Sequence, residues 1–574
     1  MRTIFLEGES SDDGRIKWLL SVSLAVFVYL FNPFGLLDET QDLSQRLSQR
    51  GYALLFDKGY ENQNITSVII DSVTVDSLGS DTGYPVNMDV HATLLRTILC
   101  GGPSSIYIDI AFQNARPDLR SQQTESEAVE RLRRALATRA GDAYCQQFDA
   151  QKQPVDTEIF LARVIPQKGD CAAFSMDTTV PTSPKCQRFR PLDALQSVVT
   201  PISISRVQPT VQHVRYPLFA TATNAFRFQD DDAASARRRM PKVEKSPATA
   251  MMLAFCKNQS PNDVQRTLCE KLSADEPDDV LSDLSDTLNL VPLWRYYVDE
   301  RQLWQRFQSQ SLLSAIQEQS AQSSGSPTPS QQSVLRPASA PSDAENRCRF
   351  PQKVVQDGSA WFLTASNFGV ALLGELFGGP KNISWAGFVP RFGEGTCLPY
   401  PYLPGSVVSE LRNACAAPNG CGNALQKAFG GKAIVYGYDI DAANDNFQSP
   451  VLGRLPGMIV HAAALDNLMR FGTDYKKEAV DFGSFQLDAN KLNLILVFVL
   501  GTIGVLRSWS WFTTSQAAVF QVSAVGAAVL LPATIGLPPF DWIGSSVLGL
   551  LTGSFWKSGH LNMRQIEMEK VQTS

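Results

Sequence analysis

Four apolar stretches mark the two ends of the chain, one near the N-terminus and three near the C-terminus. The first, 18–37, has 20 residues and no charge, and it is long enough to cross a hydrocarbon core of about 30 Å. The others lie at 491–507, 516–537 and 541–556, with charges only at their boundaries. Two of them have an uncharged core of roughly 15 residues, which is also typical of a buried helix in a soluble protein. Their clustering favours membrane crossing, so the pattern predicts four transmembrane helices around a polar region, 38–490.

The positive charges beside these stretches predict their orientation, because Lys and Arg are enriched on the cytoplasmic side. Arg2, Arg15 and Lys17 precede the first stretch, and acidic residues from Asp38 onward follow it. The segments 1–17 and 557–574 are therefore expected in the cytoplasm, with 38–490 outside it and 537–541 in an outer turn. Lys491 and the pair at 476–477 are the exceptions. A cleaved signal peptide is the rival interpretation, but Leu30–Phe34 lacks the small-x-small cleavage pattern.

Cysteine usage favours the same placement. The chain has ten cysteines, all between Cys100 and Cys421, and none falls in a segment predicted to be cytoplasmic. Oxidising compartments preserve disulfides, so this distribution suits a periplasmic or extracellular region. Cys100 ends an apolar run and is expected to be a buried free thiol. Close spacing makes three disulfides plausible: Cys171–Cys186, Cys256–Cys269 and Cys415–Cys421.

Composition and motifs narrow the function classes. The formal net charge of −6 gives no general attraction to nucleic acid, and the basic run 237–245 follows three aspartates, as in a solvated loop. There is no CxxC and there are four histidines in all, so we expect no zinc site, other metal or cofactor. The sequence contains no GxSxG, Walker, HExxH or kinase signature, and we therefore expect no catalytic residue and no enzyme activity.

The outer region shows α/β patterning at both of its ends. A β-branched strand at 65–71, a helix at 90–99 and a strand at 105–110 form a predicted βαβ unit, whose strands should be parallel, buried and adjacent. Near the other end, the sequence predicts a strand at 432–437, a polar loop at 438–450 and a helix at 459–470.

The middle of the region is less regular. Helical patterns occur at 126–138, 248–256 and 407–415, and strand-like patterns at 159–164 and 198–204. The window 309–346 is rich in Ser, Gln, Pro and Ala, so it is predicted to be a disordered insertion. The sequence does not predict the fold of 115–310 as a whole.

Several polar side chains are candidates for ligand binding. Asp71 and Asp109 follow the two strands of the βαβ unit, at the edge where ligands bind in open α/β sheets. Capping of the following helices is the alternative role for both. Asp439 and Asp445 lie in the polar loop, where an acidic surface is the alternative to a cation site. His461 begins a helix and is either a structural histidine or a ligand-binding, pH-sensitive group.

Two separated blocks resemble the second CHASE family of bacterial extracellular sensor domains. The first block contains Val68-Ile69-Ile70-Asp71 and Ile106-Tyr107-Ile108-Asp109, and the second contains Ile434-Val435-Tyr436-Gly437 and Leu455-Pro456-Gly457 through His461. The resemblance covers about 44–112 and 425–472 and includes the order of one leading and three trailing spans. It implies an α/β sensor domain outside the cytoplasm, commonly joined to a cytoplasmic histidine kinase, serine/threonine kinase or nucleotide cyclase.

The chain departs from that family pattern at its C-terminus. Eighteen residues follow Trp556, too few for a catalytic domain, so any signal is expected to reach a separate membrane or cytoplasmic partner through the spans. That partner would be a kinase, a cyclase or a subunit of an envelope complex, and a homo-oligomer is also possible. The resulting expectation is a multi-pass protein of a bacterial inner membrane that senses a ligand or envelope condition. The alternative is a structural or scaffold subunit of an envelope assembly.

Overall fold

The computed structural model describes the chain in segments, which together form two compact units. One unit, called the helical unit here, takes its residues from 1–52, 368–379 and 476–574, and the other, called the sheet unit, from 53–367 and 380–475. The described residues are 62–78, 86–110, 112, 124–146, 156–164, 193–204, 216–217, 219–221, 243–259, 261–273, 289–290, 402–415, 424–440, 446–449, 453–472, 479–482, 485–508, 513–534 and 540–549, with Thr40 and Ser44. The predicted insertion 309–346 and the first predicted span lie outside them.

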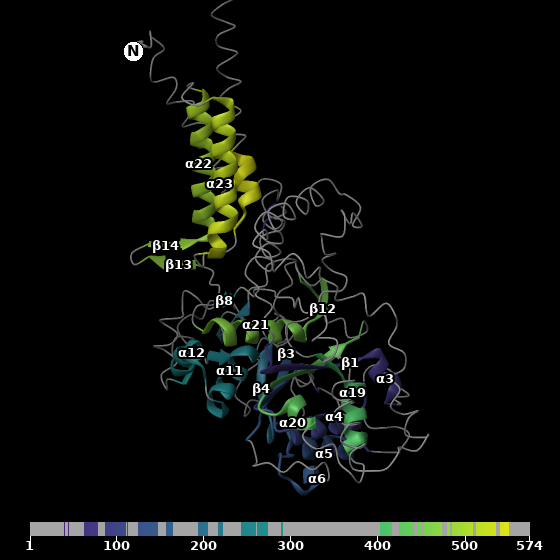
Figure 1. The fold of residues 1–574 in the computed structure, drawn as a ribbon. Coiled ribbons are helices and arrows are strands. Elements are labelled where there is room, and N and C mark those ends of the chain that lie inside the picture. The colour runs from purple at the N-terminus through teal and green to yellow at the C-terminus, as the bar shows by residue number, and fades with distance from the viewer. Residues whose placement is uncertain are drawn as a thin grey trace, which may run out of the picture. The chain divides into compact units, whose positions relative to one another are not determined.

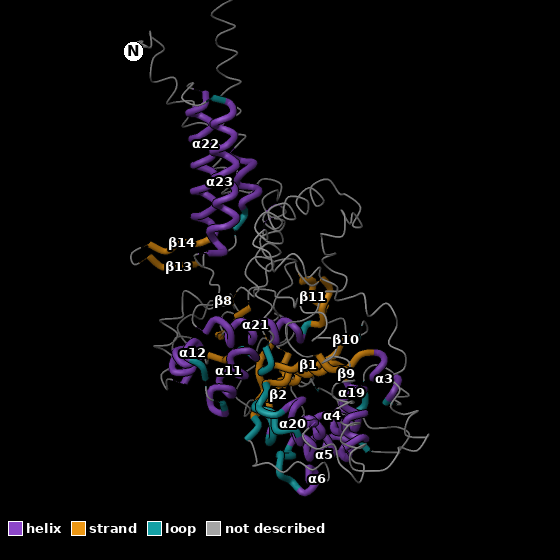
Figure 2. The backbone as a smooth tube through the Cα atoms, in the orientation of Figure 1, coloured by secondary structure: helices purple, strands orange, loops and turns teal. Residues whose placement is uncertain are grey.

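A parallel six-stranded sheet forms the centre of the sheet unit (Figure 2). Its strand order is β4-β3-β2-β10-β1-β9, and every neighbouring pair runs parallel. The strands are β1 (Ile65–Asp71), β2 (Ser105–Ile108), β3 (Glu158–Val164), β4 (Thr200–Ile204), β9 (Tyr402–Pro404) and β10 (Ala433–Asp439). The predicted parallel α/β class is therefore confirmed.

The predicted adjacency of the first two strands is wrong. β10, which lies more than three hundred residues later in the chain, is inserted between β1 and β2 and pairs with both. Buried parallel strands can accept a neighbour on either edge, and a βαβ connection fixes their direction but not whether another strand separates them. Hence the two ends of the sensor-like region in the sequence meet at the middle of one sheet.

Helices cover both faces of this sheet (Figure 1). The face called the α4 face is covered by α4 (Met88–Cys100), α5 (Glu125–Leu136), α8 (Asp193–Gln196), α19 (Gly405–Cys415) and α20 (Ala424–Phe429). The opposite face, the α21 face, is covered by α11 (Pro247–Asn258), α12 (Asp263–Ser273) and α21 (Met458–Phe471). Successive side chains of β1 point to opposite faces of the sheet. Ile65 and Ile69 therefore pack on the α21 face, and Val68 and Ile70 pack on the α4 face. Burial on both faces explains the continuous apolar strands.

Local capping sets where several helices begin and end. Asn87 accepts a hydrogen bond from the Val90 amide at the start of α4, and Thr124 forms a capping box with Glu127 at the start of α5. α4 stops at Gly101-Gly102, and Gly102 has a φ of 71°, a left-handed conformation that glycine adopts without strain. These helices cover the predicted 90–99 and 126–138 to within a few residues.

The polar loop predicted at 438–450 is partly wrong. β10 continues through Asp439, and β11 (Asn446–Ser449) pairs antiparallel with β12 (Gly453–Pro456). The polar residues therefore belong in part to a strand end and a hairpin. Further short antiparallel pairs are β5 (Tyr216–Pro217) with β8 (Asn289–Leu290), β6 (Phe219–Thr221) with β7 (Val243–Lys245), and β13 (Ala479–Phe482) with β14 (Phe485–Asp488).

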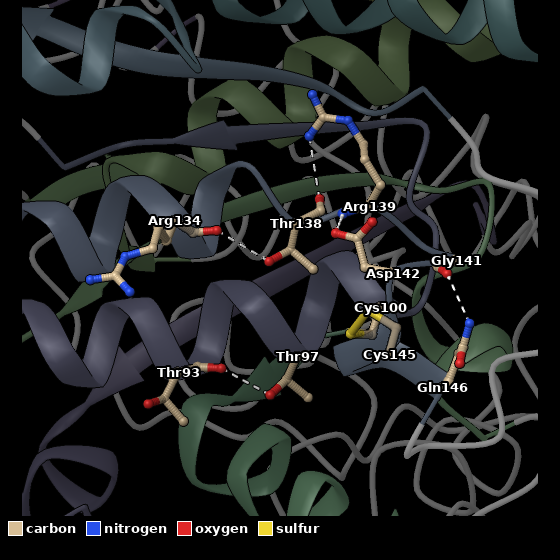
Figure 3. Close-up of a disulfide and its surroundings, with 10 residues drawn as sticks. All are labelled: Thr93, Thr97, Cys100, Arg134, Thr138, Arg139, Gly141, Asp142, Cys145 and Gln146. Atoms are coloured by element: carbon tan, nitrogen blue, oxygen red, sulfur yellow. Dashed lines mark hydrogen bonds between the residues drawn. A yellow bond between two sulfur atoms is a disulfide. The ribbon is translucent and has the colours of Figure 1, made fainter.

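Each face of the sheet carries a disulfide whose two cysteines are both described. On the α21 face Cys256 of α11 is bonded to Cys269 of α12, the pair that the spacing predicts. On the α4 face Cys100 is bonded to Cys145 of α6 (Ala143–Gln146), as Figure 3 shows, so the expected free thiol is wrong. The two cysteines are 45 residues apart in sequence and meet because α5 packs along α4 and returns the chain to its last turn.

The remaining disulfide predictions reach beyond the described residues. Cys415 is disulfide-bonded, and no cysteine among the described residues is free. Its predicted partner Cys421, and the predicted pair Cys171–Cys186, lie outside the described residues.

The described part of the helical unit consists mainly of helices. α22 (Ala489–Ser508) packs against α23 (Thr514–Thr534), and a further helix runs through 542–549. Leu496, Leu500, Phe540, Trp542 and Ile543 form its apolar core. Within the described part of the chain, no helix meets both the length and the hydropathy that crossing a membrane requires.

Candidate functional site

Two ionisable side chains meet on the α21 face of the sheet. Asp109 directly follows β2, and its Oδ2 lies 3.9 Å from Nε2 of His461. The side chains of Asp109 and His461 are only 6% and 7% exposed. Tyr107 lies two residues earlier on the same side of β2, and its hydroxyl donates a hydrogen bond of 3.0 Å to Oδ1 of Asp109. The sequence named both Asp109 and His461 as candidates, and the structure brings them together.

Helix α21 positions His461 over the sheet. The helix begins at Met458, after Gly457, and most of its residues are buried, His461 among them. On the far side of the imidazole, Nδ1 is 2.8 Å from the hydroxyl of Tyr216 on β5. That hydroxyl also accepts a hydrogen bond from the Ala248 amide of α11. Four segments distant in sequence therefore build one buried polar cluster: Tyr107 and Asp109, Tyr216, Ala248 and His461.

The contacts fit the tautomer of the neutral imidazole in which Nδ1 accepts from Tyr216; in the other tautomer Nδ1 would donate to the same oxygen. Because the Tyr216 oxygen already accepts the Ala248 N–H, its own proton is available for Nδ1 of His461. With Nδ1 as the acceptor, the proton of the neutral ring lies on Nε2. The Nε2–H group is the one that faces Asp109, at a distance beyond a hydrogen bond.

Burial dominates the electrostatics of the cluster. It raises the pKa of Asp109 from 3.8 to about 6, while the hydrogen bond from Tyr107 acts in the opposite direction. Burial likewise raises the pKa of the Tyr216 hydroxyl well above its ordinary value, and the nearby Asp109 adds to this shift. The cluster therefore holds a carboxyl group that titrates near neutral pH and a phenol that stays protonated there.

The other predicted site residues have different surroundings. Asp71 accepts hydrogen bonds at its Oδ1 from both the amide and the hydroxyl of Thr74, at 2.8 and 2.5 Å, so it caps α3 (Ser72–Ser77). Asp439 ends β10 and is paired in register with Asp71. Asp445 lies outside the described residues. The capping role that was the alternative for Asp71 is thus present.

The chemistry available to the cluster is proton exchange. Among the described residues there is no group of three or more His, Cys, Asp or Glu side chains that could hold a metal ion. A carboxyl group and an imidazole this close can bind, release or share a proton, and neither is a nucleophile activated by a neighbouring base.

A second buried histidine lies on the α4 face. His91 of α4 is 1% exposed, and its Nδ1 and Nε2 each lie 2.8 Å from a tyrosine hydroxyl, those of Tyr436 and Tyr438. Phe112 packs against the ring at 5.1 Å between centroids. Burial, followed by the proximity of Tyr438, raises the pKa of Tyr436 well above its ordinary value.

Sequence reasoning missed all of the tyrosines and His91. Two signals were present: a histidine on the buried side of an apolar helix, and tyrosines at alternate positions, 436 and 438, of one strand. Tyr107 also precedes Asp109 by two residues and therefore shares its side of β2. Tyr216 belongs to a two-residue strand, which leaves no pattern to recognise.

The comparisons with known proteins agree with this architecture. The family model described as the CHASE2 domain matches residues 21–506, most of the chain. No curated protein and no solved structure matches the chain. The chain therefore belongs to the CHASE2 family, a family of sensor domains, and the resemblance seen in the sequence is confirmed.

Proposed function

We propose that this chain is a membrane-anchored sensory protein of a bacterial inner membrane. Its sheet unit lies outside the cytoplasm, detects a ligand or an envelope condition, and passes the response through membrane helices to a separate protein. The sensory role follows from the family to which the chain belongs. The orientation follows from the charges beside the apolar stretches.

A hydrogen-bond network in the helical unit carries the topological part of the proposal. Asp541 accepts hydrogen bonds from the hydroxyls of Thr40 and Ser44, at 2.7 and 2.8 Å. The amide of Gly544 donates to Asp541, and Ser545 in the next turn donates to Asn493 of α22 at 3.1 Å. The network therefore joins residues at three places in the sequence. These are just after the first apolar stretch, at the start of the second and at the start of the fourth.

Four alternating crossings would bring these same points to one membrane surface. In the predicted topology the segments after 37, before 491 and at 537–541 all lie on the outer side. A network that joins residues 40, 44, 493 and 541 is consistent with that arrangement. Polar groups that satisfy one another at such a boundary avoid the cost of lone polar groups in hydrocarbon.

Exposed apolar side chains provide further support. α22 exposes Leu494, Ile495 and Phe498 at 43–51%, and α23 exposes Val519, Phe520 and Val522 at 50–72%. Large apolar side chains grouped on a helix surface indicate contact with lipid or with another protein. Both contacts belong to the proposal, since the anchor needs lipid and the relay needs a partner.

Protease accessibility in spheroplasts tests the topology. With the protein in its native membrane, we expect added protease to cleave within 309–346 and to leave a tag at the N-terminus and a tag inserted after Trp509 intact. The tag after Trp509 is the matched control because the same scheme places that connection inside. Cleavage at the internal tag, or protection of 309–346 in spheroplasts that admit the protease, would contradict the orientation.

In-cell photocrosslinking tests the relay. A photoreactive residue at Val522, which is 72% exposed on α23, should capture a kinase, a cyclase or an envelope-complex subunit. The same residue at Leu500, which is fully buried on α22, is the control and should capture nothing outside the chain. Products containing only lipid or a second copy of the chain would remove the support for a separate partner and favour the scaffold alternative.

A further inference from the structure

The buried cluster on the α21 face has little contact with solvent. The side chains of Asp109 and His461 are each less than a tenth exposed, and Tyr216 is 1% exposed. A molecule or hydrated ion would need a larger opening than these exposed fractions provide. A proton needs no such opening, because it can arrive through transient water or neighbouring hydroxyls.

We propose that the stimulus read by this domain is the proton, and that loss of a proton from the Asp109 carboxyl group loosens α21 from the sheet. The inference rests on the proposed sensory function and names the signal for it. In the protonated form, Asp109 is neutral, which suits its buried position beside Ile108 and Tyr107. The proton leaves to water, and a charged carboxylate remains in a site with little solvent.

The geometry explains why this charge disturbs the packing. Tyr107 supplies one hydrogen bond to the carboxylate, and the Asp109 amide is already bonded to the carbonyl of Tyr436 on β10. In the tautomer with its proton on Nε2, His461 presents a donor to Asp109, but at 3.9 Å it is about 1 Å too far for a hydrogen bond. Either His461 moves toward Asp109 together with the first turn of α21, or water enters. Both outcomes break the present contacts between α21 and the sheet.

Other charged and titratable groups around the cluster are accounted for. Asp466 of α21 accepts a hydrogen bond from Asn62 at 2.9 Å. Lys257 of α11 is paired with Glu158 of β3, which is in register with Ser105 at the opposite end of β2 from Asp109. Asp439 at the end of β10 shares the sheet edge with Asp109, and a negative charge there would hold the Asp109 proton more tightly. Among the described residues, Asp109 is thus the group of this cluster whose protonation changes near pH 6.

The position of α21 in the chain connects this event to the helical unit. α21 ends at Phe471, the sheet unit ends at Tyr475, and the chain continues into β13, β14 and α22 of the helical unit. His461 therefore lies on the last helix before the chain passes from one unit to the other. The segment 472–488, which contains β13 and β14, joins α21 to α22, and movement of α21 would reach α22 through it.

Hydrogen exchange on the full-length protein, reconstituted in lipid, tests the inference. Exchange of α21 is measured by mass spectrometry at about pH 5 and about pH 7 and is divided by exchange of α4 in the same molecule, which cancels the intrinsic effect of pH. Because the pKa of Asp109 is about 6 in the closed form, we expect the opening equilibrium of α21 to increase about tenfold between these pH values.

Variants locate the source of the effect. Asp109→Asn keeps a neutral side chain of the same shape and should hold α21 protected at both pH values. Asp71→Asn changes a carboxyl group at the end of the neighbouring strand and should leave the tenfold change intact. His461→Gln retains a hydrogen-bonding partner for Tyr216 but lacks the imidazole, and it should reduce the change. It also serves if Asp109→Asn does not fold.

The outcomes separate this inference from the function that it deepens. Proton sensing would be overturned if the native protein showed the same ratio of α21 to α4 exchange at both pH values. It would also be overturned if Asp109→Asn or His461→Gln showed the same tenfold change as the native protein. Either result would leave the topology and the relay standing, since those are tested by proteolysis and crosslinking. A failed crosslinking result, in turn, would not alter the pH dependence of α21.

Discussion

Each face of the central sheet buries a histidine–tyrosine cluster, and the cluster on the α21 face also contains the carboxyl group of Asp109. Each face buries a histidine that is hydrogen-bonded to tyrosine, His91 on the α4 face and His461 on the α21 face, and each has a disulfide between two described cysteines. His91 contacts two tyrosine hydroxyls, whereas His461 contacts one and faces Asp109 across 3.9 Å. The buried acid beside His461 makes the packing of the α21 face depend on pH.

Removal of a disulfide is the change expected to have the largest effect on stability. Cys100–Cys145 closes 45 residues and Cys256–Cys269 closes 13, so loop entropy assigns them about 4 and about 3 kcal/mol of stabilisation. Replacing each pair with alanines should lower the free energy of unfolding in that order, as measured by denaturant titration of the oxidised protein. A larger loss from the α21-face pair would mean that strain or residual structure outweighs loop length.

The next effect is the pH dependence contributed by Asp109. Its pKa in the folded protein is raised from 3.8 to about 6, so between these values the folded state binds more protons than the unfolded state. The stabilising contribution is complete below about pH 4 and is lost as the pH rises through about 6, a change of about 3 kcal/mol. Asp109→Asn should remove this loss in pH-dependent denaturant titrations, whereas His91→Gln on the α4 face should leave it unchanged. The same slope in both variants would refute a special role for Asp109.

Tyrosine-to-phenylalanine substitutions compare the faces more closely. Tyr216→Phe leaves both the Ala248 amide and Nδ1 of His461 without their buried partner, and we expect a loss of about 2 kcal/mol. Tyr436→Phe removes one partner of His91, whose ring keeps Tyr438, so we expect about 1 kcal/mol. Thermal unfolding of the two variants under one buffer condition provides the measurement. Equal losses would indicate that the Ala248 amide finds another acceptor.

The smallest effect separates Asp71 from Asp109. Because Asp71 accepts two hydrogen bonds from Thr74 and caps α3, Asp71→Ala should cost about 1 kcal/mol both near pH 5 and near pH 7. Comparing its denaturant midpoints near pH 5 and near pH 7 with those of the native protein checks this. If the midpoint difference between Asp71→Ala and the native protein changed strongly between pH 5 and pH 7, part of the pH response would arise at Asp71 rather than at Asp109.

Local patterns in the sequence predicted elements better than they predicted contacts. The strand 65–71, the helices α4 and α5 and the parallel class could be predicted because apolar periodicity, caps and the Gly101-Gly102 stop are local signals. The insertion of β10 between β1 and β2 could not, since strand order depends on how the whole sheet packs. For the same reason Cys100 was assigned no partner, although Cys145 lies beside it in the fold.

The candidate site was found in parts. Asp109 and His461 were recognisable as a strand-end acid and a histidine at a helix start, but 352 positions separate them and no pattern links them. Tyr216 comes from a two-residue strand in a region without regular periodicity. Tyr107 and His91 were detectable by alternation and by helical phase, respectively, once the faces of their elements were known.

The most direct test is the titration of Asp109 itself. Infrared difference spectroscopy of the full-length protein in lipid, with Asp109→Asn as the reference, isolates the band of the protonated carboxyl group. The buried environment predicts that this band is half lost near pH 6. Half-loss near 3.8, the ordinary value for an aspartate, would contradict the distinction between the two faces.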